Sequence, residues 1–143
     1  MSDPLTVLSR VRGLLSDSGM ALIRIPTVSS YAWEHYGVNW VGLDAPRHQF
    51  LYSLKAIRLL AGKAGFSLKD VIYDSTGFQF WGSEQYLKDI PLRDERSYDT
   101  DPQKSIFTDA QIKQFDLRAE ELNNAKKGDT IGIFLAKEVL EGR

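Results

Sequence analysis

Apolar residues recur along the chain with two different periods, and together they predict helices alternating with strands. The first apolar face, which repeats at helical spacing, consists of Leu5, Leu8, Val11, Leu14 and Leu15. Asp3 before Pro4 is typical of an N-cap followed by the first helical position, where the missing N–H of proline costs nothing. Because Gly19 lies just past the last apolar position, we expect a helix at residues 4–16.

Three short apolar runs indicate strands rather than helices. The run MALIRIP ends at Pro26 and is too brief for a helix, so it predicts a strand at residues 20–25 that is buried on both faces. Further strands are expected at residues 68–74 and 130–137. Strands that alternate with helices predict an α/β fold.

Capping signals mark two further helices. Ser53 is a candidate N-cap for a helix that ends at Gly65. Thr108 and Gln111 form the T-x-x-Q pattern of a capping box, which predicts a helix directly after Thr108. A short helical stretch is expected near residues 83–88.

The chain has the size and apolar content of a single domain, residues 1–143. Its 143 residues are 43% hydrophobic, which is enough for one core. We expect loops at residues 27–50 and 77–107. The first has no clean period at its start and is an aromatic-rich loop or a short helix, and the second is polar with two prolines after its short helical stretch.

Charge and residue usage exclude several classes of function. Lys and Arg (18) nearly balance Asp and Glu (19), so the net charge of -1 predicts neither nucleic-acid nor membrane binding. The chain has no Cys, which removes disulfides and thiolate sites, and no apolar stretch approaches the ~18 residues of a membrane span. We therefore expect a cytoplasmic protein. Neither a G-x-G-x-x-G nor a G-x-x-x-x-G-K-[ST] pattern is present, so no nucleotide cradle is expected.

The polar turn Asp44-Ala-Pro-Arg47-His48 carries the main candidate chemistry. In a structural interpretation Asp44 caps the turn, Arg47 pairs with Asp44 or with a helix end, and His48 is a half-buried histidine. In a functional interpretation His48 acts as a base or hydrogen-bond donor while Arg47 holds an anionic group. A metal site would require His48 and His35, the only two histidines, to converge with carboxylates, and none is predicted.

Aromatic residues gather just before this turn. They are Tyr31, Trp33, Tyr36 and Trp40. Packing in a core or lid is the simple explanation, and an apolar substrate pocket is the alternative. Residues 28–43 contain no Lys or Arg, so stacking on single-stranded nucleic acid is not expected.

The order of these pieces resembles the C-terminal half of class I S-adenosylmethionine-dependent methyltransferases. That family has a helix with a P-L-x-x-L-x-x-x-x-x-L-L pattern and an S-G step into its fifth strand, which Pro4 to Leu15 and Ser18-Gly19 match. A substrate-side D-x-P-R-H loop and a helix ending in A-G-F follow, matched by Asp44 to His48 and by residues 53–66. The likeness covers nearly the whole chain.

The resemblance implies a partial Rossmann-like fold and a set of site residues. Its three-stranded mixed sheet would be ordered 20–25, 130–137, 68–74, with the last strand antiparallel in the middle. His48 would be the catalytic base or an acceptor ligand. The substrate-binding residues would be Arg47, Asp44, Tyr31, Trp33, Tyr36 and Trp40.

The cofactor of the family is S-adenosylmethionine, but its glycine-rich loop and the acidic residue that holds the ribose are absent from this sequence. We therefore expect no cofactor binding by this chain alone. The missing strands imply a bare sheet edge, and hence a homodimer or a partner that supplies those strands. In a complete enzyme the methyl acceptor would be a small molecule. Two alternatives remain, namely a non-catalytic α/β oligomerisation or interaction module and an unrelated α/β domain that binds a small molecule.

Overall fold

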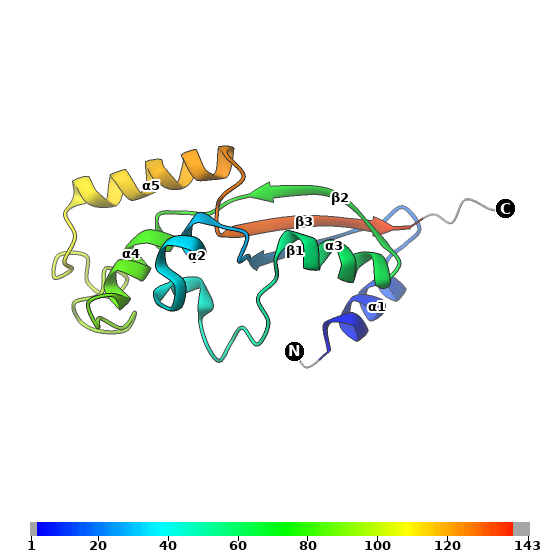
Figure 1. Ribbon diagram of the computed structural model, residues 1–143, viewed down its shortest axis with the longest axis horizontal. Helices are drawn as coiled ribbons and strands as arrows, with labels where there is room; N and C mark the ends of the chain where they lie inside the picture. The colour runs from blue at the N-terminus through cyan, green and yellow to red at the C-terminus, as the bar shows by residue number, and fades with distance from the viewer. Residues whose placement is uncertain (1–2, 139–143) are drawn as a thin grey trace.

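The computed structural model describes residues 3–138 and contains a sheet flanked by helices (Figure 1). In chain order, the elements are α1 (Pro4–Leu14), β1 (Met20–Pro26), α2 (Tyr31–Tyr36), the 3-10 helices η1 (Gly37–Asn39) and η2 (Val41–Leu43), α3 (Leu54–Lys63), β2 (Phe66–Tyr73), α4 (Phe78–Tyr86), α5 (Asp109–Asn124) and β3 (Thr130–Lys137). The predicted α/β class is confirmed.

The sheet has three strands in the order β1-β3-β2. Both pairings are antiparallel, with Ile133 of β3 opposite Ile23 on one side and Val71 on the other. The predicted order, with the last strand antiparallel in the middle, is confirmed. The prediction of a mixed sheet is wrong, because β1 and β2 run parallel to each other but never pair.

Side-chain caps fix the helix starts as the sequence predicted. The Asp3 carboxylate accepts from the N–H groups of Leu5 and Thr6 at the start of α1. Ser53 caps α3, and Thr108 forms a reciprocal capping box with Gln111 at the start of α5. These caps satisfy N–H groups that have no partner within the helix.

Two helices differ from the sequence prediction. The helix expected near residues 83–88 is α4, which begins at Phe78. Its start has no side-chain cap of its own, and the preceding Gly77 N–H donates instead to Asp116 of α5 at 3.1 Å. The segment 27–50, expected to be a loop with at most one short helix, contains α2 and two 3-10 turns. Contacts distant in sequence therefore set these boundaries.

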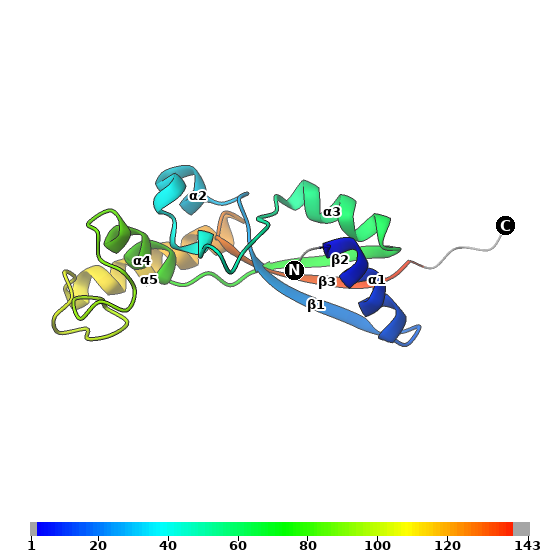
Figure 2. The ribbon, with the colours of Figure 1, turned by 90° about the horizontal axis from the view of Figure 1, so that it is seen from below.

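One face of the sheet carries the first hydrophobic core. Figures 1 and 2 place α1 and α3 beside the same part of the sheet, and both helices pack on this face. The buried residues of this core are Leu8, Ile57, Ala61, Ala64, Phe66, Ile131, Ile133 and Leu135.

The opposite face of the sheet is largely uncovered. Met20 and Leu22 are 58% and 59% exposed, and Ile72 on β2 is 41% exposed. The prediction that the first strand is buried on both faces is therefore wrong, because α1 and α3 both cover the same side. Leu14 is also exposed, although its spacing predicted a core position.

A second hydrophobic core lies beyond the sheet and is built by α2, η2, α4 and α5. Its buried residues are Ala32, Tyr36, Trp40, Val41, Phe80, Ala119 and Leu122. Figure 1 shows β1 and β2 both pointing toward this group of helices. The second core therefore lies at the carboxyl ends of the two parallel strands, where α/β folds commonly bind their ligands.

Candidate functional site at the strand ends

A cavity of about 480 Å³ lies between the end of β1, the start of β3 and the turn that follows η2. We call it the strand-end cavity. Its charged lining residues are Arg24, Asp44, Arg47, Arg93, Asp99 and Asp129. His48 also lines it, so the cavity brings together all three residues of the predicted polar turn.

The polar turn is closed by its own backbone and by one ion pair. The N–H groups of Arg47 and His48 donate to the Asp44 carbonyl at 2.8 and 3.3 Å. Arg47 Nη1 lies 3.1 Å from Asp44 Oδ2, so the predicted pairing of these residues is confirmed. Asp44 has a positive φ of 39°, a conformation that Asp tolerates better than most residues, and the Ala45–Pro46 peptide is cis. The turn therefore presents His48 in a defined orientation.

The His48 ring is held through one of its two nitrogens. Nδ1 lies 3.1 Å from the carbonyl oxygen of Gly42. A carbonyl oxygen only accepts hydrogen bonds, so Nδ1 carries the hydrogen in this contact. In the neutral imidazole the lone pair is then on Nε2. His48 is half-buried and lines the cavity, so this arrangement can supply a proton acceptor there.

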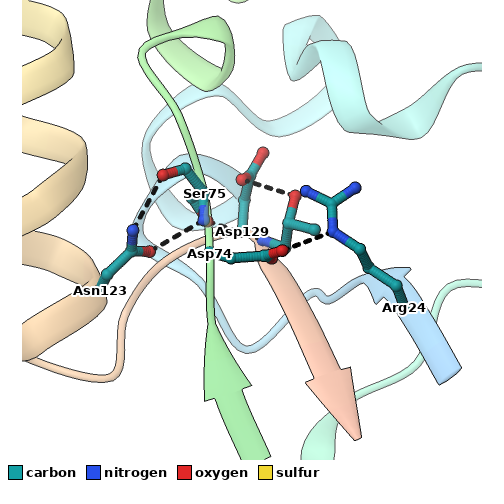
Figure 3. Close-up of polar contacts among 6 residues, drawn as sticks. Arg24, Asp74, Ser75, Asn123 and Asp129 are labelled. Carbon is teal, nitrogen blue, oxygen red and sulfur yellow. Dashed lines mark hydrogen bonds and ion pairs between the residues drawn. The ribbon is translucent and has the colours of Figure 1, made fainter. Parts of the chain in front are cut away.

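The charges around the cavity are partly paired. Arg24 Nε lies 2.6 Å from Asp74 Oδ2 across the sheet (Figure 3). Among residues 3–138, neither Arg93 nor Asp99 has an ion-pair partner. The cavity therefore offers one guanidinium and one carboxylate that a polar ligand could engage.

Asp129 is the buried carboxyl group of this region and was not singled out from the sequence. Its Oδ2 accepts from Trp40 Nε1 at 2.9 Å, and its Oδ1 accepts from Thr130 Oγ1 at 3.2 Å. Burial raises the pKa of Asp129, and hydrogen bonds from Trp40, Ser75 and Thr130 offset part of that rise. An Asp directly before an apolar strand was the available sequence signal.

The neighbouring strand end is anchored by a reciprocal pair of hydrogen bonds. Ser75 N–H donates to Asn123 Oδ1 at 3.1 Å, and Asn123 Nδ2 donates back to the Ser75 carbonyl at 2.8 Å (Figure 3). The Ser75 hydroxyl also accepts from Thr130 N–H at 2.8 Å. These contacts tie α5 to the end of β2 and to the start of β3.

Gln79 of α4 also lines the cavity and was not predicted. It is 1% exposed, and its Nε2 donates to the Thr76 carbonyl at 3.3 Å. Its Oε1 is buried and has no hydrogen-bond partner among the described residues. An unpartnered buried amide oxygen costs stability. Nothing in the local sequence distinguishes this glutamine from its neighbours.

The four predicted aromatic residues do not line the strand-end cavity. Trp40 and Tyr36 are buried in the second core, and the Tyr36 hydroxyl donates to Glu84 at 2.9 Å. Burial and Glu84 raise the pKa of Tyr36. Tyr31 and Tyr36 border a different groove beside α5, and Trp33 packs edge-on against Trp40. Their substrate-binding role stays a prediction.

Two further kinds of feature are absent from residues 3–138. No group of three or more His, Asp or Glu side chains there is arranged to hold a metal ion. None of the helices in that part of the chain has the length and apolar character needed to cross a membrane.

Comparison with known proteins does not assign the chain to a family. No protein-family model matches it, and no curated protein matches it either.

Proposed function

We propose that this chain is the substrate-recognition half of an S-adenosylmethionine-dependent methyltransferase, which transfers methyl groups when a cofactor-binding half completes it. The observation that carries the proposal is the His48 imidazole, which lines the strand-end cavity and whose Nδ1 lies 3.1 Å from the Gly42 carbonyl oxygen. The sheet order β1-β3-β2 supports a Rossmann-like fold, because it is the order that the sequence resemblance implies for the last three strands.

The side chains of the cavity suit the acceptor side of such a reaction. Methyl transfer to an oxygen or nitrogen nucleophile requires removal of a proton, and Nε2 of His48 is the group that accepts it. Arg93, which has no ion-pair partner within residues 3–138, holds an anionic part of the acceptor. Arg47 is engaged by Asp44, and this pair fixes the wall beside His48.

The residues present do not fit the cofactor itself. S-adenosylmethionine would supply a methyl group from its sulfonium, and it needs a turn at a strand end that lets its adenosyl group approach the backbone. Here the turn after β1 is occupied by the chain, because Thr27 donates its N–H to the Asp129 carbonyl at 2.8 Å. The turn after β2 is closed by Asp116, which a Cβ at Gly77 would meet. The cofactor site therefore belongs to residues outside this chain.

The open edge and the uncovered face of the sheet also indicate a partner chain. Within residues 3–138, no strand pairs with the outer edge of β1, and the uncovered sheet face carries Leu22 and Ile72. An open edge beside exposed aliphatic side chains favours pairing with another chain. The partner is either a second copy of this chain or the segment that carries the cofactor-binding half.

Two measurements test the proposal. Calorimetry of the isolated chain with S-adenosylmethionine should detect no micromolar binding, whereas the chain joined to a cofactor-binding half should bind it. The completed protein, given radiolabelled S-adenosylmethionine and a small-molecule extract of the host cell, should then label an acceptor.

Two histidine variants make this test specific. His48→Ala should reduce labelling by ~10²-fold or more, the usual contribution of a general base. His35→Ala is the matched control and should keep full labelling, because His35 stacks on Tyr31 and does not line the cavity. Unchanged turnover in His48→Ala would refute the assignment of the base. Micromolar cofactor binding by the isolated chain would refute the division into halves.

The uncovered sheet face supports a second candidate, a non-catalytic oligomerisation or interaction module. In that case self-association would persist in His48→Ala, and no completed form of the protein would transfer methyl groups. The first candidate is preferred because a pure interaction module has no use for the oriented imidazole in the strand-end cavity.

A further inference from the structure

Asp129 and Trp40 form a buried pair directly behind the His48 turn. Their contact, Nε1 to Oδ2 at 2.9 Å, joins residues that are 89 positions apart in the sequence. Trp40 is fully buried and Asp129 is 5% exposed, so water competes little for this hydrogen bond. The carboxylate therefore fixes the plane of the indole ring.

The indole ring in turn supports the peptide that holds His48. A Cβ at Gly42 would overlap the Trp40 ring, so glycine lets the backbone lie directly against the indole. The carbonyl of that same Gly42 accepts from His48 Nδ1 at 3.1 Å. Asp129, Trp40, Gly42 and His48 thus form one continuous series of contacts.

A second anchor holds the other side of this peptide. Val41 N–H donates to Ser83 Oγ at 3.0 Å, and Ser83 Oγ donates to the Gln79 carbonyl at 2.7 Å. The segment between Trp40 and Gly42 is therefore fixed to Asp129, just before β3, on one side and to α4 on the other. The Gly42 carbonyl has little freedom to turn away from His48.

We infer that Asp129 is a positioning residue for His48. It acts through Trp40 and Gly42, and it keeps the hydrogen on Nδ1, which leaves the lone pair on Nε2. This deepens the proposed function and rests on it, because the free Nε2 has a catalytic use only if His48 accepts a proton. The tautomer itself can be measured whether or not methyl transfer occurs.

The test is a nitrogen NMR measurement of the histidine tautomers in the full chain. At about pH 9 an ordinary imidazole is neutral, so the two ring nitrogens report which of them carries the hydrogen. The chain has only two histidines, and His35 is exposed and serves as the internal reference in every sample. Wild-type His48 should be mainly the Nδ1–H tautomer.

Three variants separate positioning from charge and from general stability. Asp129→Leu removes the acceptor and should shift His48 toward the Nε2–H tautomer that an unrestrained imidazole favours. Asp129→Asn removes the charge but keeps an oxygen for Trp40, so it should retain the wild-type tautomer. Gly42→Ala leaves Asp129 in place, but its Cβ pushes the residue 42 peptide away from the Trp40 indole. It should therefore shift the His48 tautomer in the same direction as Asp129→Leu.

The tautomer measurements test the positioning role of Asp129 independently of methyl transfer. The inference is overturned if wild-type His48 is mainly the Nε2–H tautomer. It is also overturned if Asp129→Leu keeps the wild-type tautomer while unchanged His35 signals show that the variant folds. If Asp129→Leu does not fold, Trp40→Phe, which keeps an aromatic ring but breaks the contact with Asp129, decides in the same way. Confirmed tautomers in a protein that never transfers methyl groups would overturn the proposed function and leave the positioning role intact.

Discussion

Gln79 and Gln85 are both fully buried on α4, yet only Gln85 has hydrogen bonds at both ends of its amide. Gln85 Nε2 donates to Ser97 Oγ at 3.0 Å, and its Oε1 accepts from Tyr98 N–H at 2.8 Å. Gln79 lines the strand-end cavity with an unpartnered Oε1. One glutamine therefore stabilises the loop after α4, whereas the other leaves an unpartnered buried oxygen beside the cavity.

Replacing each glutamine by methionine should reveal this difference. Gln85→Met leaves Ser97 Oγ and the Tyr98 N–H without their hydrogen-bond partner. It should lower the free energy of unfolding by ~1–3 kcal/mol. Gln79→Met removes an unsatisfied oxygen and one long hydrogen bond, so it should stay within ~1 kcal/mol of wild type or exceed it. Urea unfolding followed by circular dichroism measures both variants. Equal losses would contradict this account of Gln79.

The buried carboxyl of Asp129 should make stability depend on pH. Burial raises its pKa in the folded chain. In the unfolded chain the pKa of an Asp is ~3.9, so above that pH the unfolded chain loses this proton before the folded chain does. The contribution of Asp129 to stability therefore falls as pH rises through its folded pKa. Asp129→Asn cannot ionise, so its free energy of unfolding relative to wild type should be higher at about pH 7 than at about pH 4.

Urea unfolding of both proteins across this pH range measures the effect. Asp99→Asn, which removes an exposed carboxylate from the same cavity, controls for the change in net charge. A difference between Asp129→Asn and wild type that is constant with pH, or that falls as pH rises, would contradict the prediction.

Trp40 should contribute more to stability than the adjacent Trp33. Trp40→Phe opens a cavity in the second core and leaves the Asp129 carboxylate without its indole donor, so we expect a loss of ~2–4 kcal/mol. Trp33 is only half-buried, so Trp33→Phe should cost less than half as much. Circular dichroism is the suitable probe, because both changes alter tryptophan fluorescence. Similar losses in the two variants would show that the Asp129 contact adds little.

The uncovered sheet face should control self-association. Leu22→Lys places a charge among exposed aliphatic side chains beside the free edge of β1, and it should convert an associated chain to monomers. Leu14→Lys is the matched control, since Leu14 is 87% exposed on α1, and it should leave association unchanged. Light scattering over a range of concentrations measures both. A wild-type chain that stays monomeric at high concentration would rule out the homodimer.

Local signals in the sequence predicted much of the fold. Asp3-Pro4, Ser53 and the Thr108–Gln111 pair each act within one helical turn, so the starts of α1, α3 and α5 were predictable. The strand order was also predictable, but through the family resemblance rather than from hydrophobic patterns. The two-sided burial of β1 was not, because an apolar run such as MALIRIP does not reveal whether a helix covers each face.

The candidate site was only half predictable. Asp44, Arg47 and His48 are close in sequence, and their pairing follows from the turn that contains them. Asp129 and Gln79 act through partners that are brought near by packing of the second core, and no pattern within a short window encodes such contacts. The hydrogen on Nδ1 of His48 likewise depends on Gly42, whose place on the indole ring becomes visible only in three dimensions.

The central position of β3 also sets the order in which the protein can assemble. Both outer strands pair only with β3, which follows them in the sequence, so β1 and β2 have no partner while the chain is being synthesised. Asp129 precedes β3 directly and reaches Trp40 only when that strand is in place. Late, long-range pairing of this kind slows folding and leaves apolar strands exposed in the meantime. The sheet and the support behind His48 therefore form together, once β3 has paired with both outer strands.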